Sequence, residues 1–298
     1  MITGSTKLAG LFASPAAHSL SPFIHNKAFE VNEINAVYLA FDVDNQRLPQ
    51  AVESIRTFDM LGANLSMPNK KAVFPLLDAI SEEAQLIGAV NTIVHKNGKL
   101  IGYNTDGRGF WQSADRAGIQ WKNEKAVILG AGGAAKAIAV QAALDGIGEI
   151  AIYKRKNATF AQTVRFFEDI AKQTRCPIRV IDFSDEKQLA KDLAESRLLI
   201  NATDIGMGSK KDETPLTHPE MLSAKLAVAD LIYAPSETRL LKEAKHAGAV
   251  TLNGLGMLLH QGAAAFELWT GKKMPIETIR KELEQKEQNN DHHNENRS

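Results

Sequence analysis

The chain has 298 residues, which is enough for two domains of ordinary size. Hydrophobic residues make up 44% of it and charged residues 23%, globular values that argue against wholesale disorder and against a fibrous repeat. The 35 Lys and Arg balance the 35 Asp and Glu, so the chain lacks the basic excess that is typical of nucleic-acid-binding proteins.

Strand and helix patterns alternate along the first third of the chain. Apolar runs rich in β-type residues predict strands at Lys7–Ala13, Ala36–Val43, Gly62–Met67 and Ala89–His95. Apolar residues spaced three and four apart predict helices at Pro22–Asn32 and Arg47–Phe58. The pair Asn97-Gly98, which lies between two short apolar runs, predicts a tight hairpin turn.

A helical pattern from Asp106 to Gln120 leads into a second series of the same kind. Its predicted strands are Ala126–Leu129, Glu149–Tyr153, Ile178–Phe183, Leu198–Asn201, Ala227–Tyr233 and Ala249–Leu252. The predicted helices between them are Ala134–Leu144, Phe160–Thr174, Glu186–Glu195 and Thr238–Ala247. Strands that alternate with helices in this way predict an α/β fold with largely parallel sheets.

The C-terminal region differs from both series. A long helical pattern, Met257 to Trp269, comes too late to belong to the second sheet, so we expect it to return to the first domain. Residues 285–298 contain no apolar residue, and they are predicted to form a disordered tail. The pair His292-His293 lies in this tail, where histidines are usually inert, so no metal site is expected.

A glycine-rich turn gives the strongest local signal. The apolar run Ala126–Leu129 leads directly into a turn and a helix start, formed by Gly130, Ala131, Gly132, Gly133 and Ala134. This is the dinucleotide-binding pattern, with Ala135 in the place of the third small residue. The free N–H groups and the positive end of the helix dipole would hold the pyrophosphate. The alternative is a tight turn that binds nothing.

The residues after the next predicted strand indicate which dinucleotide binds. An NAD site usually has a carboxylate there, which accepts a hydrogen bond from the ribose 2′-hydroxyl. Here the cations Lys154, Arg155 and Lys156 are followed by Asn157, and no acid comes before Glu168. Cations suit a 2′-phosphate, and Arg155 could bind it through two hydrogen bonds, so NADP is predicted and NAD is the alternative. A solvated basic loop remains the other interpretation.

Polar residues near the N-terminus form a candidate substrate site. Ser19 and Ser21 precede a predicted helix, and since Pro22 suits its first position, Ser21 is the expected N-cap. Two hydroxyls at a helix N-terminus would suit a carboxylate, although a plain cap is the alternative. Lys70 follows a predicted strand, where α/β folds place ligands, but a lone lysine is more often solvated. Asp106 precedes a helix and could be only its cap.

Seven short motifs occur in a fixed order along the chain. They are Ser-Leu-Ser-Pro, Asn-Leu-Ser-Met-Pro-Asn-Lys, Gly-Ala-Val-Asn-Thr, Asn-Thr-Asp-Gly, Gly-Ala-Gly-Gly-Ala-Ala, Asn-Gly-Leu-Gly-Met-Leu and His-Gln-Gly-Ala-Ala-Ala-Phe. The series resembles the shikimate dehydrogenase family, from about Leu8 to Ile279. The resemblance implies reversible NADPH-dependent reduction of 3-dehydroshikimate to shikimate, a step of aromatic amino-acid biosynthesis.

The resemblance also implies roles for single residues. Lys70 would exchange the proton, and Asp106 would position it. The other residues implied to bind substrate are Ser19, Ser21, Ser66, Asn91, Tyr233 and Gln261. Those implied to bind cofactor are Gly130, Ala131, Gly132, Gly133, Ala134, Lys154, Arg155, Lys156, Leu231, Gly254 and Glu82.

The implied architecture is a two-domain α/β protein. A discontinuous substrate-binding domain, residues 1–106 plus 255–284, would enclose a Rossmann-type NADP-binding domain, residues 107–254. Ser66 stands where many members of the family have threonine, and Met67-Pro68-Asn69 resembles the quinate/shikimate subgroup, which often accepts NAD as well. Quinate therefore stays open as a second substrate.

Two other interpretations compete with this one. A dehydrogenase acting on methylene-tetrahydrofolate has the same architecture, but the Ser-Leu-Ser-Pro and Asn-Thr-Asp-Gly motifs argue against it. A non-catalytic NADP-binding sensor would need the glycine-rich turn but not Lys70, Asp106 and Gln261 together.

The sequence also bounds the cellular setting. A single cysteine, Cys176, excludes an intrachain disulfide framework and favours the cytoplasm. No apolar run reaches the ~20 residues of a membrane span, and the N-terminus lacks the apolar stretch of a secretory signal. We expect a small-molecule substrate as the partner, no nucleic acid and no membrane, and either a monomer or a homodimer.

Overall fold

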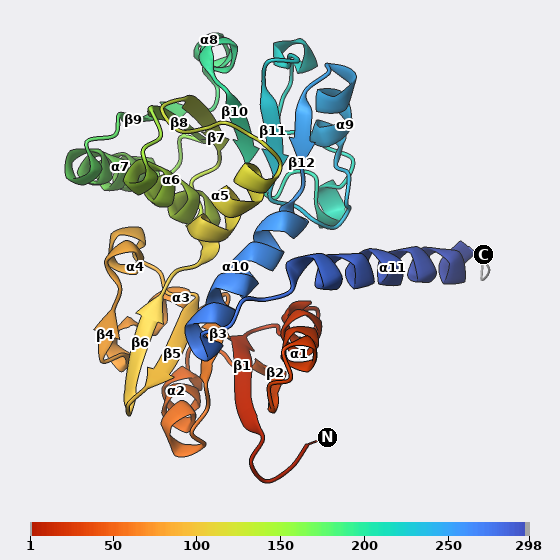
Figure 1. Ribbon diagram of the computed structural model, residues 1–298. Coiled ribbons are helices and arrows are strands. Elements are labelled where there is room, and N and C mark those ends of the chain that lie inside the picture. The colour runs from red at the N-terminus through yellow and green to blue at the C-terminus, as the bar shows by residue number, and fades with distance from the viewer. Residues whose placement is uncertain (1, 296–298) are drawn as a thin grey trace. The chain divides into compact units, whose positions relative to one another are not determined.

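The computed structural model describes residues 2–295, and for residue 284 and residues 287–295 it describes the backbone alone (Figure 1). The chain forms two compact units. The first contains residues 1–105 and resumes at residue 259, and the second contains residues 106–258. The predicted α/β fold is confirmed, since each unit combines a six-stranded sheet with helices.

The sheet of the first unit is mixed. Its strands are β1 (Lys7–Ala13), β2 (Ala36–Asp42), β3 (Gly62–Leu65), β4 (Ala79–Ile80), β5 (Thr92–Lys96) and β6 (Lys99–Tyr103). They lie in the order β2-β1-β3-β5-β6-β4, with β1 parallel to β2 and to β3. β5 is antiparallel to both of its neighbours, and it forms a hairpin with β6. The predicted hairpin turn is confirmed, with φ of 54° at Asn97 and 76° at Gly98.

Helices and an apolar core complete the first unit. The helices are α1 (Ser21–Val31), α2 (Leu48–Thr57), α3 (Asn69–Ala72), α4 (Glu82–Ile87), most of α10 (Gly254–Thr270) and α11 (Ile276–Glu295), with a 3-10 turn at Phe74–Leu76. The apolar residues of α2 explain its place in the core. Leu48, Val52 and Ile55, spaced three and four apart, are buried in one cluster with Leu65 and Ile93 of the strands.

The C-terminal segment differs from the expectation of a disordered tail. The structure continues α11 as a helix to Glu295, and residues 296–298 of the predicted tail lie outside the described residues. Residues 284–288 are Glu, Gln and Lys, which are good helix formers, so a helix that is anchored upstream can extend through them, whereas the Asn, Asp and His residues at 289–294 favour a helix only weakly. The anchor consists of buried Ile279 and Leu283 and an ion pair of 3.0 Å between Lys27 and Glu282.

The sheet of the second unit is entirely parallel. Its strands are β7 (Lys125–Leu129), β8 (Glu149–Lys154), β9 (Ile178–Asp182), β10 (Leu198–Asn201), β11 (Ala227–Asp230) and β12 (Val250–Leu252). They lie in the order β12-β11-β10-β7-β8-β9, which is the Rossmann order, and the direction of winding reverses between β7 and β10.

Helices connect these strands. They are α5 (Asp106–Arg116), α6 (Gly133–Asp145), α7 (Phe160–Thr174), α8 (Glu186–Glu195) and α9 (Arg239–His246), with 3-10 turns at Gly208–Lys210 and Pro219–Met221. Helix α6 packs against both α5 and α7 (Figure 1). In a sheet wound this way, ligands bind beyond the carboxyl ends of the strands, at the point where the order reverses.

Within residues 2–295, no helix combines the length and the apolar character that a membrane crossing requires.

Candidate functional site

The glycine-rich turn lies at the reversal point of the second sheet, directly after β7. Gly130 has φ of 98°, a conformation that side chains rarely adopt, and a Cβ built on it would lie 2.9 Å from the carbonyl oxygen of Ala202. The turn can therefore pass the loop after β10 in this conformation only with glycine at this position. Gly132 is the N-cap of α6, and apart from its two chain neighbours no residue comes within 4 Å of a Cβ built on it.

Helix α6 begins at this turn. Gly133 and Ala134 are its first two residues, and Ala135 is fully buried. The first N–H groups of a helix have no partners inside the helix, and the helix dipole places positive potential there. Because Gly132 leaves open space beside these groups, the backbone can approach a phosphate closely.

A cavity of about 340 Å³ opens at the carboxyl ends of β7, β8 and β10. Its walls contain five of the predicted cofactor residues, namely Gly130, Ala131, Gly132, Lys154 and Arg155. Asn157 also lines it, at the side where an NAD site would carry a carboxylate. The cavity therefore has the place and the lining that a dinucleotide requires.

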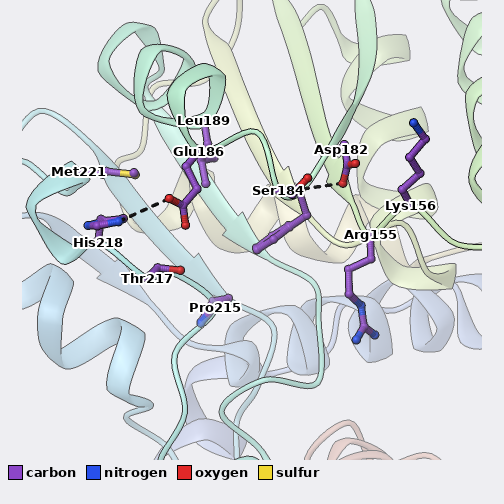
Figure 2. Close-up of a pocket in the computed structure, with 11 residues that line it drawn as sticks. Arg155, Lys156, Asp182, Ser184, Glu186, Leu189, Pro215, Thr217, His218 and Met221 are labelled. Carbon is purple, nitrogen blue, oxygen red and sulfur yellow. Dashed lines mark hydrogen bonds and ion pairs between the residues drawn. The ribbon is translucent and has the colours of Figure 1, made fainter.

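The cations at the end of β8 and just after it do not all face this cavity. Lys154 donates a hydrogen bond of 3.0 Å to Asn157, and both line the cavity, as does the exposed Arg155. Lys156 instead lines a second cavity of about 450 Å³, which Arg155 shares. Figure 2 shows the side chains of Arg155 and Lys156 pointing away from one another at this second cavity. The structure thus brings Lys154 and Arg155 to the glycine-rich turn but not Lys156.

The second cavity also has acidic residues in its wall. Asp182 and Glu186 line it, and the Glu186 carboxylate lies 3.5 Å from His218 Nε2 (Figure 2). Ser184 donates its backbone N–H to the Asp182 carboxylate over 3.2 Å, which shapes the loop after β9. The second cavity therefore has charges of both signs.

The loop after β10 supplies further residues of this site, which were not predicted from the sequence. Thr203, Asp204 and Lys210 line the same 340 Å³ cavity as the glycine-rich turn. Asn201, fully buried at the end of β10, holds the start of this loop, since its Oδ1 accepts hydrogen bonds from the Thr203 N–H at 3.1 Å and the Thr203 hydroxyl at 2.7 Å. The signal in the sequence was a polar residue at the end of a fully buried strand.

A buried carboxyl group connects this loop to the next one. Asp230, at the end of β11, accepts hydrogen bonds from Asn201, from the Ile232 N–H and from the Thr238 hydroxyl, at 2.8 to 3.1 Å. Burial raises its pKa, and these three donors act against that shift. The bond to Ile232 turns the chain, which is why β11 ends at Asp230 instead of continuing to Tyr233 as predicted.

The turn after β11 brings two predicted cofactor residues together. Gly254, the first residue of α10, donates its N–H to the carbonyl oxygen of Ile232 over 2.9 Å. A Cβ built on Gly254 would lie 2.0 Å from the carbonyl oxygen of Leu231, so Leu231 and Gly254 are in close contact. Tyr233, two residues after Leu231 in the same turn, is partly exposed.

The first unit has a polar edge of its own, where the segment after β3 meets the segment before β5. Leu65 donates its N–H to the carbonyl oxygen of Asn91 over 2.8 Å, which places Ser66 beside Asn91. The carbonyl oxygen of Lys70 accepts a hydrogen bond of 2.8 Å from the Val90 N–H, so α3 is tied to the same segment. The structure therefore gathers Ser66, Lys70 and Asn91 at one edge of the sheet.

Helix α3 is held in place by the side chain of Asn69, a residue for which no sequence pattern indicates this role. Asn69, fully buried, donates hydrogen bonds to the carbonyl oxygens of Val43 at 2.7 Å and Phe12 at 3.2 Å. These oxygens lie near the carboxyl ends of two neighbouring strands, β1 and β2. The two hydrogen bonds therefore fix the position of the backbone from which the Lys70 side chain extends. Lys70 is partly exposed and has polar interactions of its own.

The start of α1 corrects one expectation. Ser21 is the first residue of the helix and Leu20 is the N-cap, so Ser21 does not cap the helix as predicted. Ser19 contributes there instead, because its hydroxyl oxygen accepts a hydrogen bond of 3.2 Å from the Ser21 N–H. The Ser21 hydroxyl hydrogen-bonds to the phenol of Tyr38, a residue of β2.

A buried line of hydrogen bonds runs from that phenol to Asn91. Tyr38 donates to Asn64 Oδ1 over 2.8 Å, and Asn64 Nδ2 donates to the Thr92 hydroxyl over 3.1 Å. Thr92 in turn donates to Asn91 Oδ1 over 2.9 Å. None of these four residues is more than 6% exposed, so this line holds Ser21 and Asn91 in one rigid frame.

The neutral imidazole of His25 packs beside this line of hydrogen bonds. Its ring stacks on Tyr38 with 4.5 Å between the centroids, and it is 1% exposed. Burial lowers the pKa of His25 to about 3, so the imidazole is neutral at physiological pH.

The remaining predicted site residues are distributed over the two units. Gln261 lies in the part of α10 that belongs to the first unit, and Glu82 is the exposed first residue of α4. Asp106 is the buried first residue of α5, and it opens the second unit. Both Gln261 and Asp106 have polar interactions.

Known proteins share both the sequence and the fold. The sequence model of the protein family described as the shikimate dehydrogenase substrate-binding domain matches residues 11–93. The family model of the shikimate 5′-dehydrogenase C-terminal domain matches residues 254–284. A shikimate dehydrogenase (NADP(+)) of Listeria innocua is 46% identical over 95% of this chain and 97% of its own length.

Two solved structures extend this similarity to three dimensions. The shikimate 5-dehydrogenase of Listeria monocytogenes, in complex with shikimate and NAD, is 46% identical with a TM-score of 0.92, over 95% of this chain and 98% of that one. The shikimate 5-dehydrogenase of Thermus thermophilus, in complex with NADP(H) and shikimate, is 34% identical with a TM-score of 0.79. The match covers 93% of this chain and 98% of that one.

Proposed function

Since the chain belongs to the shikimate dehydrogenase family, we propose that it catalyses the reversible NADPH-dependent reduction of 3-dehydroshikimate to shikimate. The observation that carries this proposal is the 340 Å³ cavity, in which Lys154 and Arg155 lie beside the glycine-rich turn. A relative crystallised with NADP(H) and shikimate supports the same substrate and cofactor.

The residues present fit the cofactor. The pyrophosphate would lie on the N-terminus of α6 beside Gly132, and the adenosine 2′-phosphate on Lys154 and Arg155. When bound, NADPH supplies the hydride that reduces the carbonyl carbon. Gly254 is assigned to the nicotinamide side, Leu231, which it contacts, would also bind the cofactor, and Glu82 would lie near the cofactor.

The reduction also needs a proton for the oxygen of the carbonyl group, and a side chain of this protein would supply it. In the proposed reaction, the Lys70 ammonium polarises the carbonyl oxygen and donates a proton as the alkoxide develops. In the reverse direction, the neutral amine removes the proton of the hydroxyl. Asp106 would accept a hydrogen bond from a substrate hydroxyl and position Lys70.

The substrate would bind through its carboxylate and its hydroxyls. We assign the carboxylate to the hydroxyls of Ser19 and Ser21, which lie at the start of α1. Residues assigned to the ring hydroxyls are Lys70, Asn91, Asp106 and Gln261, while Ser66 would also bind substrate and Tyr233 would line the site. The substrate-binding domain would comprise residues 1–106 and 255–284, and the NADP-binding domain residues 107–254.

The setting and the assembly state are also part of the proposal. Cys176 is buried and burial raises the pKa of its thiol to about 11, so it is inert, as suits a reducing cytoplasm. A monomer or a homodimer would serve the chemistry equally well.

Steady-state oxidation of shikimate and of quinate, each with NADP and with NAD, tests the proposal. We expect the highest kcat/KM with shikimate and NADP. An equal or higher kcat/KM with NAD would show that the cations at the end of β8, Lys154 and Arg155, do not select NADP. A chain that binds NADP but oxidises neither substrate would instead be the non-catalytic sensor.

A further inference from the structure

The loop after β10 places an ion pair on the wall of the cofactor cavity. Lys210 Nζ lies 2.7 Å from Asp204 Oδ2, and both residues line the cavity with the glycine-rich turn. The backbone between them is closed on itself, because the Gly206 N–H donates to the carbonyl oxygen of Lys210 over 3.1 Å. The base of the Lys210 side chain is therefore held at this wall.

Two further cations of the same cavity act together with this pair. Lys154 and Arg155 come from the end of β8, and Arg155 lies near enough to Asp204 to affect its titration. The hydrogen bond from Lys210, supported by the charge of Arg155, lowers the pKa of Asp204, so its carboxyl is ionised at neutral pH. The charged residues that line this cavity in the described chain are thus three cations and one anion, from two loops.

A phosphate monoester fits this arrangement better than a hydroxyl does. It carries a charge of about −1.5 to −2 at pH 7 and has three acceptor oxygens, more than a single guanidinium can satisfy. A lysine ammonium has three donors on a flexible stem, so Lys210 can hydrogen-bond to Asp204 and to a phosphate oxygen at the same time. The negative charge of Asp204 opposes the phosphate and weakens this attraction.

We propose that Lys210 is a further cation for the 2′-phosphate of NADP, and that Asp204 holds Lys210 in place while moderating the preference for NADP over NAD. This inference rests on the proposed use of NADP. It assigns cofactor selectivity to two loops, where the sequence indicated only the one after β8.

Single substitutions at Lys210 and at its neighbour separate this role from general effects. Lys210→Met keeps an unbranched side chain that is one atom shorter, and it removes the charge. Lys211→Met is the matched control, because Lys211 is the next residue and lines a different cavity, with Asp212 and Glu237. NADP and NAD differ only in the 2′-phosphate, so the ratio of their KM values reports on that group alone.

For Lys210→Met we expect KM for NADP to rise about three- to tenfold and KM for NAD to change by less than about twofold. Lys211→Met should change both values by less than about twofold. Asp204→Asn, which removes the charge and keeps an acceptor oxygen, should lower KM for NADP by about twofold. Calorimetric titration of each variant with adenosine 2′,5′-bisphosphate and, separately, with adenosine 5′-monophosphate measures binding without turnover. The affinity for the bisphosphate should change as the affinity for NADP does, and the affinity for the monophosphate should stay nearly constant.

Each outcome has a distinct meaning. Equal changes in KM for NADP and NAD with Lys210→Met, or no change in either, would overturn the role of Lys210. A rise in KM for NADP with Asp204→Asn would overturn the moderating role of Asp204. An unsubstituted chain that binds the bisphosphate no more tightly than the monophosphate would instead refute the proposed use of NADP.

Discussion

At the scale of single residues, the position of Lys70 depends on its neighbour. Asn69 binds the ends of two strands, and Lys70 follows it at the polar edge of the first sheet. Lys71 is the next residue of α3, about 100° further around the helix axis, so its side chain leaves in another direction.

We therefore expect Lys70→Ala to lower kcat by about 10² to 10⁴, with little change in KM for shikimate, because general acid–base help of this size is lost. Steady-state kinetics in both directions measure this loss. Lys71→Ala is the control and should keep its turnover. A Lys70→Ala variant with a kcat near that of the unsubstituted chain would exclude Lys70 from the proton transfer.

The residue scale also shows where sequence reasoning is weak. The pattern of Ser21 before Pro22 predicted a helix cap, yet the helix begins one residue earlier and the Ser21 hydroxyl hydrogen-bonds to Tyr38. Ser21 belongs to α1 and Tyr38 to β2, and no local sequence pattern indicates a contact between them. Lys210 is a similar case, since a single lysine in a loop has no sequence signature.

At the scale of elements, the line from Tyr38 to Asn91 joins β2, β3 and β5. Thr92 is its central member, because its hydroxyl accepts from Asn64 and donates to Asn91. Valine has the shape of threonine but no hydroxyl, so it would leave both asparagines short of a buried hydrogen-bond partner.

We expect Thr92→Val to lower the free energy of unfolding by about 1–3 kcal/mol and to raise KM for shikimate, with KM for NADP unchanged. Thr92→Ser, which restores the hydroxyl, should recover KM. Thr163→Val provides the control, since that buried hydroxyl donates to the carbonyl oxygen of Thr159 and should affect stability alone. If Thr92→Val leaves KM for shikimate unchanged, the line does not position Asn91.

A second cluster joins elements in the other unit. Asp192 of α8, fully buried, accepts hydrogen bonds from Lys125 of β7 at 2.7 Å, Tyr153 of β8 at 2.6 Å and Arg179 of β9 at 2.8 Å. Burial alone would raise the pKa of Asp192, but these donors outweigh it and lower the pKa to about 2.

Because the pKa of Asp192 in the folded state lies below the ~3.9 of an unfolded aspartate, its ionisation stabilises the fold above that value. This contribution should decline as the pH falls from about 4 through about 2. Asp192→Asn should lower the free energy of unfolding by about 3 kcal/mol at pH 7, as measured in urea. The difference from the unsubstituted chain should narrow below about pH 4, whereas a constant difference would contradict this account.

Asp169→Asn is the matched control for Asp192→Asn. The Asp169 side chain is 67% exposed, and its carboxylate forms a surface pair with Lys172 at 3.8 Å. Loss of a surface pair should change stability by less than about 0.5 kcal/mol.

At the scale of the whole molecule, α11 shows how little of the C-terminus the first unit needs. Ile279 and Leu283 are buried, whereas residues 285–298 contain no apolar residue. Tolerance to truncation follows the burial of the residues removed.

Deletion of residues 289–298 should therefore leave both Tm and kcat/KM unchanged. Deletion from Ile276 onward removes both buried anchors and should lower Tm by several degrees or more, because each buried apolar side chain contributes about 1.5–3 kcal/mol. Thermal unfolding of the two truncated chains compares these effects. A lower Tm after the shorter deletion would assign a structural role to the polar end of α11.

Local sequence patterns were enough to predict the alternation of strands and helices, the hairpin at Asn97-Gly98 and the dinucleotide turn at Gly130. These features depend on residues close together in the chain, through periodic burial and backbone conformations that favour glycine or asparagine. No such pattern predicts that Lys210 lines the cavity of Lys154 and Arg155, or that hydrogen bonds connect Tyr38 to Asn91; the folded chain is needed to see both. Such contacts join residues that strand order brings together, and strand order is set by the packing of the whole sheet.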